Sequence, residues 1–339
     1  MNDPILVWGG GAIGGTMAAY WVRAGLDVLI VDIEVEHVKA CRTGGLKITG
    51  PVEAFGVTVP ATVPDQLTGE FSRIVLAVKA QHTSRATQTL APHLAKTGCV
   101  VSAQNGLNER VISEVIGEER TIGAFVNFGA DWHQPGEILF GNRGAVVIGE
   151  LDGKRRQRTN DIYKLMQVFE PNAVLTDNIW GYLWGKLAYG AMLFATALNN
   201  DSMADNFSDP LRAPAWIGLG REVMGLAHKR GVRPVGFNGF DPNAYAPQAS
   251  VDESARSIAE LAAFNRQSAK THSGIWRDLA VRKRKTEIDE QISILSVLAR
   301  EVDMDVPLID CLVELIHDIE SGDREISFET FSILLQRCG

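Results

Sequence analysis

The stretch Ile5-Leu6-Val7-Trp8-Gly9-Gly10-Gly11-Ala12-Ile13-Gly14 stands near the start of the chain and decides the fold of its first half. Its four apolar residues predict a short buried strand, and the glycines that follow have the spacing GxGxxG. Residues 12–24 then show a helical pattern, with Gly25 as the stop. A strand, a glycine turn and a helix in this order are typical of a dinucleotide-binding unit.

The motif residues have distinct physical roles. Gly9 permits the tight turn, Gly11 lets the backbone approach a pyrophosphate, and Gly14 lets the helix pack close to the sheet. The helix start at Ala12 and Ile13 offers N–H groups and a partial positive charge to phosphates. A glycine-rich turn without a ligand is the alternative interpretation, and the flanking strand and helix disfavour it.

Asp32 follows the next apolar run, residues 28–31. A carboxylate there can accept hydrogen bonds from the ribose hydroxyls of NAD and would repel the 2′-phosphate of NADP. Asp32 could also cap the helix that follows, and the two roles are compatible. We therefore expect NAD as the cofactor, with NADP less favoured.

The two halves of the chain have different patterns. Short apolar runs at 46–49, 74–78, 100–103 and 121–126 predict further parallel strands. After about residue 150, helical patterns follow at 158–170, 180–198, 210–230, 251–270, 286–302 and 308–320. We expect an α/β protein in which a Rossmann-type doubly wound sheet (residues 1–152) precedes an all-helical domain (residues 153–339).

Composition narrows the functional class. The 339 residues include 33 Lys+Arg and 41 Asp+Glu, a net charge of −8, which argues against a nucleic-acid partner. The four cysteines form no CxxC pair and have no histidine at metal-ligand spacing, so we expect free thiols and no metal. The apolar stretch 187–198 is shorter than the ~20 residues of a membrane span. With no signal peptide apparent at the N-terminus, we expect a cytoplasmic protein that binds a small molecule.

Several polar residues are candidates for the site. Lys79 and Asn105 follow two of the predicted strands, where ligands of α/β sheets gather. Lys79 could contact cofactor phosphate or ribose, and Asn105 could bind the nicotinamide side or the substrate, although Asn-Gly is also a common turn pair. Lys186, among tryptophans and aliphatic residues, could snorkel to the surface or serve as a general acid. Glu287 could be a helix-dipole partner or an active-site acid.

Together these segments resemble the ketopantoate reductase (2-dehydropantoate 2-reductase) family. The resemblance rests on the glycine loop, Val78-Lys79-Ala80, Gln104-Asn105-Gly106-Leu107, Ile179-Trp180 with Gly185-Lys186-Leu187-Ala188, and Lys285-Thr286-Glu287-Ile288-Asp289. It implies that Lys186 is the general acid, that Glu287 supports it and borders the cofactor, that Asn105 lies at the active centre, and that Lys79 lies near the cofactor. It also implies a 2-oxo or 2-hydroxy acid substrate, a site between the domains and a homodimer.

The sequence departs from the family pattern at three places. Substrate-binding asparagines usually stand four and eight residues after the lysine, where this chain has Gly190 and Phe194. The usual substrate-binding serine could be Ser273, although a strict count places Gly274 nearest. The family usually has a basic residue, for NADP, where Asp32 stands.

We therefore expect an NAD(P)-dependent oxidoreductase that transfers hydride between nicotinamide and a 2-oxo or 2-hydroxy acid. One alternative is a catabolic NAD-dependent dehydrogenase that oxidises a different hydroxy acid. The alternative from another class is a dinucleotide-sensing regulator, a kind of protein that keeps the glycine loop and loses the proton donor. The presence of Lys186 and Glu287 favours an enzyme.

Overall fold

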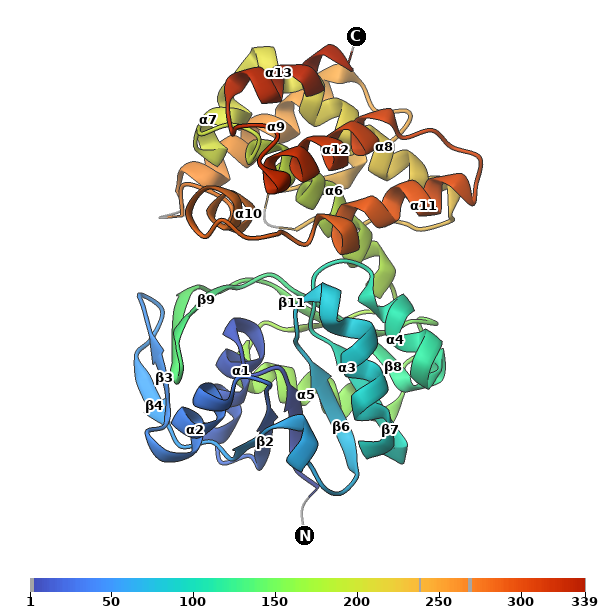
Figure 1. Cartoon of the computed structure of the whole chain (residues 1–339). Coiled ribbons are helices and arrows are strands. Elements are labelled where there is room, and N and C mark those ends of the chain that lie inside the picture. Colours follow the sequence, from blue (N-terminus) through green and yellow to red (C-terminus); the bar gives the residue numbers. More distant parts are fainter. Residues whose placement is uncertain (1–2, 238, 268–269, 339) are drawn as a thin grey trace. The chain divides into compact units, whose positions relative to one another are not determined.

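The computed structural model describes residues 3–237, 239–267 and 270–338. The chain folds into two compact units, Met1–Ile179 and Trp180–Gly339. Figure 1 shows both units, coloured along the sequence.

The first unit is built on a sheet of eight strands in the order β12-β11-β8-β7-β6-β1-β2-β5. All neighbouring strands pair in parallel except β8 and β11, which are antiparallel. The strands are β1 (Ile5–Trp8), β2 (Val28–Val31), β5 (Ala61–Thr62), β6 (Phe71–Leu76), β7 (Leu94–Ser102), β8 (Thr121–Val126), β11 (Val146–Glu150) and β12 (Val174–Leu175).

Helices cover both faces of this sheet (Figure 1). On one face, α1 (Ala12–Arg23), α2 (Val35–Thr43) and α5 (Gln157–Phe169) contribute to one hydrophobic core. On the other face, α3 (Thr83–Leu90) and α4 (Asn108–Ile116) contribute to a second core. Two apolar layers need strands that are buried on both sides, which explains the nearly continuous apolar runs of β1 and β2. The predicted doubly wound architecture is confirmed.

A second, four-stranded sheet has the order β4-β3-β10-β9. Its strands are β3 (Leu46–Thr49), β4 (Phe55–Val57), β9 (Gly129–Gln134) and β10 (Glu137–Asn142). The expectation that residues 46–49 join the large sheet is wrong, because β3 pairs antiparallel with β4 and parallel with β10. Lys47 is exposed between buried Leu46 and Ile48, an alternation that suits a strand with one face in solvent.

Helix α5 packs on the first unit. The indole Nε1 of Trp21 in α1 donates to the carbonyl oxygen of Leu165 at 2.9 Å, and Ile162 and Met166 lie in the same core. The boundary expected after residue 152 falls before α5, whereas the compact units divide after Ile179.

The second unit consists mainly of helices, as expected. They are α6 (Ile179–Thr196), α7 (Met203–Ser208), α8 (Ala213–Lys229), α9 (Val251–Arg266), α10 (Gly274–Trp276), α11 (Ile294–Arg300), α12 (Pro307–Ser321) and α13 (Phe328–Gln336). Pro307 opens α12, and Gly322 ends it in the left-handed conformation with φ +85°, both as predicted. Within the described residues, no helix combines the length and apolarity needed to cross a membrane.

Two predicted helices have different bounds in the structure. The one expected over 251–270 ends at Arg266, and residues 268–269 lie outside the described residues. The one expected over 286–302 forms a π-helical segment, Asp289–Ser293, that leads into α11. Thr286 stays outside the helix because its N–H and hydroxyl bond to Glu320 instead.

Candidate functional site

The glycine loop connects β1 to α1. Gly9 has φ +100°, and a Cβ there would lie 2.9 Å from the backbone of Ala77 and of Val78. A Cβ at Gly14 would overlap the carbonyl oxygen of Gly9. These two glycines are therefore required by the turn and by close packing, as predicted.

Gly11 differs from the other two glycines of the motif. A Cβ built on it meets no atom within 4 Å, so packing within the protein does not require a glycine there. Gly11 is also the N-cap of α1 and has no side chain to cap the first turn of that helix. The open space beside an uncapped helix N-terminus fits a pyrophosphate, whose oxygens could accept hydrogen bonds from backbone N–H groups such as those of Ala12 and Ile13.

Asp32 lies immediately after β2. Its Oδ2 accepts a hydrogen bond from the Gly10 N–H at 2.7 Å, and its Oδ1 accepts one from the Glu34 N–H at 2.9 Å. Each carboxylate oxygen can accept a second bond, so Asp32 keeps the capacity to bind ribose hydroxyls. The neighbouring Glu34 and Glu36 add further negative charge at this strand end.

The loops that follow β6 and β7 are tied together by side chains. Gln104 Nε2 donates to the Val78 carbonyl oxygen at 2.9 Å and to Thr83 Oγ1 at 2.7 Å. The Thr83 hydroxyl in turn donates to Asn108 Oδ1 at 2.8 Å. Because β6 and β7 are adjacent and parallel, this network lies at the carboxyl ends of both strands.

Lys79 and Asn105 are exposed residues in these two loops. Asn108 Nδ2 donates to the Asn105 carbonyl oxygen at 2.5 Å, which holds the turn. The strand order β7-β6-β1-β2 therefore brings Asn105, Lys79, the glycine loop and Asp32 to one edge of the sheet. All four were predicted from the sequence, whereas the supporting roles of Gln104 and Asn108 were not.

Lys186 lies on α6 and is half-buried between Gly185 and Leu187, which are both buried. A Cβ at Gly185 would overlap the carbonyl oxygen of Val235, and the Val235 N–H donates to the Gly181 carbonyl oxygen at 2.9 Å. The glycines on this side of α6 thus allow the segment around Val235 to lie directly against the helix.

The two positions that depart from the family pattern have different environments. A Cβ at Gly190 would meet no atom within 4 Å, so one turn beyond Lys186 the helix borders open space. Phe194, by contrast, is 1% exposed and packs inside the helical unit.

Ser273 is buried and caps α10, because its Oγ accepts a hydrogen bond from the Trp276 N–H at 3.1 Å. Asn200 holds this segment in place. Its carbonyl oxygen lies 3.1 Å from His272 Nε2, and its Oδ1 accepts a hydrogen bond from Trp276 Nε1 at 3.2 Å. Gly274, the other residue considered, is exposed.

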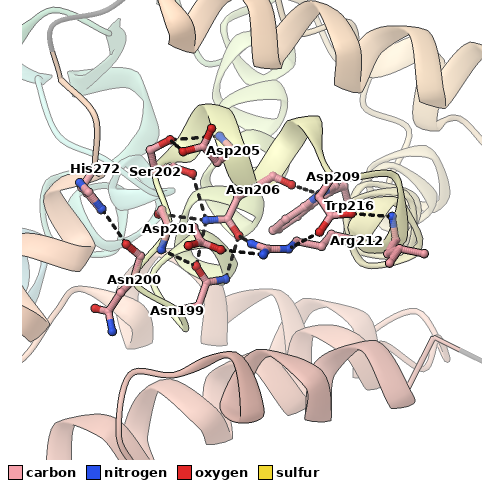
Figure 2. A network of polar contacts seen from close by, with 11 residues as sticks. Asn199, Asn200, Asp201, Ser202, Asp205, Asn206, Asp209, Arg212, Trp216 and His272 are labelled. Atoms are coloured by element: carbon pink, nitrogen blue, oxygen red, sulfur yellow. Dashed lines mark hydrogen bonds and ion pairs between the residues drawn. The ribbon is translucent and has the colours of Figure 1, made fainter.

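Figure 2 shows the polar network that holds the turn at Asn200. Arg212, 9% exposed, donates to Asp201 Oδ2 at 2.6 Å, to Asp209 Oδ2 at 3.0 Å and to Asn206 Oδ1 at 2.7 Å. A buried guanidinium with three acceptors is satisfied and fixes the connection between α6 and α7. Arg212 was not predicted from the sequence, although the polar run that follows the apolar helix was an available signal.

Glu287 lies just before the π-helical segment and is half-buried. Its Oε2 accepts a hydrogen bond from Gln291 Nε2 at 3.3 Å. The preceding residue, Thr286, donates both its N–H and its hydroxyl to Glu320 Oε1 in α12, each at 2.7 Å. Glu287 is thereby positioned from both sides. In the described residues, no group of three His, Cys, Asp or Glu side chains is arranged to hold a metal ion.

A glycine-loop Rossmann unit followed by a helical unit that carries a lysine and a glutamate is typical of two-unit NAD(P)-dependent oxidoreductases. The family model described as ketopantoate reductase PanE/ApbA matches residues 5–153, and the family model for its C-terminal domain matches residues 178–320. The chain therefore belongs to the ketopantoate reductase family.

Individual relatives agree with this assignment. A 2-dehydropantoate 2-reductase of Mesorhizobium japonicum is 26% identical over 92% of this chain and 96% of its own length. D-mandelate dehydrogenase, solved with NADH and anilino(oxo)acetate, has a TM-score of 0.81 at 19% identity, covering 94% of this chain and 99% of the other. A PanE/ApbA family ketopantoate reductase from Ralstonia eutropha JMP134 has a TM-score of 0.77 at 21% identity, covering 95% of this chain and 100% of the other. This chain is an NAD(P)-dependent oxidoreductase of the ketopantoate-reductase type.

Proposed function

We propose that this enzyme uses NAD(H) and acts on a 2-hydroxy or 2-oxo acid with a bulkier side chain than ketopantoate. The observation that carries the substrate proposal is the open space at Gly190, one helical turn from Lys186. At that position the family usually has an asparagine that binds substrate. Removal of a polar partner weakens discrimination for a substrate hydroxyl, and removal of its volume makes room for a larger group.

The cofactor proposal rests on charge. Asp32 stands at the end of β2, with Glu34 and Glu36 close by in sequence, and its carboxylate would repel a 2′-phosphate placed there. The ribose hydroxyls of NAD are neutral donors that the remaining lone pairs of Asp32 can accept.

Each candidate residue has its own role in the proposed reaction. When bound, the nicotinamide supplies or accepts the hydride. Lys186 gives a proton to the carbonyl oxygen in reduction and takes it back in oxidation. Glu287 orients Lys186 and borders the cofactor. Asn105 and Ser273 bind substrate, and Lys79 binds the cofactor. Phe194, the other position that departs from the family pattern, is buried inside the helical unit.

The test compares initial rates with NADH and NADPH on two substrates, ketopantoate and phenylglyoxylate. The latter is the oxo acid of mandelate and carries a bulky flat group. We expect NADH to be preferred over NADPH and phenylglyoxylate over ketopantoate, in kcat/KM. A clear preference for NADPH with ketopantoate would contradict the proposal. Gly190→Asn, which restores the usual family residue, should shift the preference toward ketopantoate.

A dinucleotide-sensing regulator is the competing function, and Lys186→Ala separates it from an enzyme. We expect this variant to lose turnover by orders of magnitude while its Kd for NADH stays within about threefold. Lys164→Ala, at an exposed lysine of α5, is the matched control and should keep full activity. A protein without turnover on any 2-oxo acid, yet with tight NADH binding, would favour the regulator.

A homodimer and a cytoplasmic location also belong to this proposal. Both rest on the sequence and on the family resemblance. Light scattering on the purified protein tests the first, and fractionation of the native cells tests the second.

A further inference from the structure

His37 is a buried polar residue that the mechanism above does not use. It lies on α2, is 1% exposed, and contacts the glycine loop from the side that faces the core. Its Nε2 lies 2.8 Å from the Gly10 carbonyl oxygen. Its Nδ1 lies 3.1 Å from the Gly136 N–H nitrogen and 3.3 Å from Trp132 Nε1, both in or beside the β9–β10 hairpin.

These contacts define the tautomer of His37. Two N–H donors face Nδ1, so Nδ1 accepts, and the hydrogen on Nε2 is donated to the Gly10 carbonyl oxygen. Cys41 Sγ, one turn further along α2, lies 3.7 Å from the same Nε2. The ring thus joins the glycine loop to the four-stranded sheet through two hydrogen-bonding edges.

Gly10 is held at both of its backbone polar groups. Asp32 Oδ2 accepts its N–H at 2.7 Å, and His37 donates to its carbonyl oxygen. A Cβ on Gly10 would lie 2.6 Å from Ile30 and 3.2 Å from His37, so only glycine lets the loop come this close.

Peptide planarity transmits this constraint to Gly11. The Gly10 carbonyl and the Gly11 N–H belong to one trans peptide plane, in which the two bonds point in opposite directions. With the carbonyl drawn toward His37, the Gly11 N–H points away from the core. A Cβ at Gly11 meets nothing within 4 Å, which marks open space beside this residue.

We propose that His37 is a positioning residue for the dinucleotide: by holding the Gly10 carbonyl, it aims the Gly11 N–H at the pyrophosphate. This inference rests on the proposed use of a nicotinamide dinucleotide. His37 does not touch the cofactor. It removes the alternative orientation of the Gly10–Gly11 peptide, in which a carbonyl oxygen would face the phosphates and repel them.

The experiment measures the Kd for NADH by fluorescence, well below the melting temperature of each variant. His37→Phe removes both hydrogen-bonding edges, and we expect its Kd to rise about tenfold or more. His37→Gln has an amide that can donate to Gly10 and accept from Gly136, and should recover most of the affinity. At saturating NADH, kcat of His37→Phe should stay within about twofold of the unmodified enzyme, so that the loss appears in KM for cofactor.

Val38→Ala is the matched control, because Val38 is the next residue of α2 and is also buried, with an apolar side chain. It should lower the melting temperature and leave the Kd for NADH within about twofold. A Kd for His37→Phe equal to that of the unmodified protein would overturn the inference and leave the proposed function intact. No binding of NADH or NADPH by the unmodified protein would instead overturn the proposed function itself.

A second measurement uses the unmodified protein and therefore does not depend on whether a variant folds. Nitrogen-15 NMR of histidine-labelled protein should show one buried histidine with its hydrogen on Nε2, and this resonance should shift when NADH is added. A hydrogen on Nδ1 of His37 would contradict the proposed bond to Gly10.

Discussion

Thr286 donates both its backbone N–H and its hydroxyl to one carboxylate oxygen of Glu320, 34 residues later in the chain. The same hydroxyl oxygen accepts a hydrogen bond from the Ile288 N–H at 3.2 Å. Glu287 lies between these two residues, so its backbone is fixed by a side chain from α12. A candidate active-site acid is therefore positioned by a contact that is distant in sequence.

Replacement of Thr286 tests whether this anchor matters for catalysis. Thr286→Val keeps the shape and removes the hydroxyl, so Glu287 should shift and kcat should fall about 10- to 100-fold. Thr286→Ser keeps the hydroxyl and should retain most of the activity. Melting temperatures of both variants show whether the unit stays folded, and an unchanged kcat for Thr286→Val would contradict the role of the anchor.

Neutralisation of Asp32 should change cofactor selectivity. In Asp32→Asn one carboxylate oxygen becomes an NH₂ donor, so the variant loses an acceptor and the charge that repels a 2′-phosphate. We expect KM for NADH to rise about tenfold and the preference for NADH over NADPH to shrink by at least as much. The control is Asp27→Asn, which makes the same charge change directly before the first residue of β2. It should leave KM for NADH and the preference for NADH over NADPH unchanged. An equal preference for NADH over NADPH in both variants would show that Asp32 does not recognise the ribose of the cofactor.

Gly190→Ala should raise the stability of the protein and lower its activity on a bulky substrate. Because a Cβ there meets nothing within 4 Å, alanine adds helix propensity without a clash, and the free energy of unfolding should rise by about 0.5–1 kcal/mol. The methyl group should also lower kcat/KM for phenylglyoxylate more than for smaller 2-oxo acids. Gly220→Ala on α8 is the contrast, since its Cβ would overlap the Tyr245 ring and should destabilise the protein. A lower melting temperature for Gly190→Ala would exclude open space at that position.

Glu222 should make stability depend on pH. Burial raises its pKa to about 7, although the N–H groups of Leu308 and Ile309, which donate to it at 2.8 and 2.9 Å, act to lower that pKa. Because the folded-state pKa exceeds the unfolded one, the contribution is fully present below about pH 4.3 and is lost as pH rises through about 7.

Glu222→Gln removes this titration. Between pH 5 and pH 8 the unmodified protein should lose stability relative to the variant by an amount of order 1 kcal/mol, since the group is only partly buried. Thermal midpoints of both proteins across this range measure the effect, because titrations of other groups are common to both. Parallel pH profiles would show that Glu222 titrates normally.

Local sequence signals were sufficient for much of the fold. The strand Ile5–Trp8, the glycine turn and α1 are adjacent in sequence, and their apolar period and glycine spacing report local geometry directly. Lys186 and Glu287 are predicted as site residues because they stand in recognisable motifs, and their roles in catalysis stay predictions. The supporting roles of Gln104 and His37 were missed, since each acts through partners that are distant in sequence.

The sequence by itself determined the doubly wound sheet, the helical second half and the residues at the carboxyl ends of the strands, because helix and strand periods and glycine conformations are properties of short segments. Only the tertiary structure decided that residues 46–49 pair with β4 and β10, that α5 packs with Trp21 on the first unit, and that His37 holds Gly10. These features depend on which distant segments come into contact. The free energy of such contacts comes from burial and hydrogen bonding between segments whose local sequences do not indicate which partner each will meet.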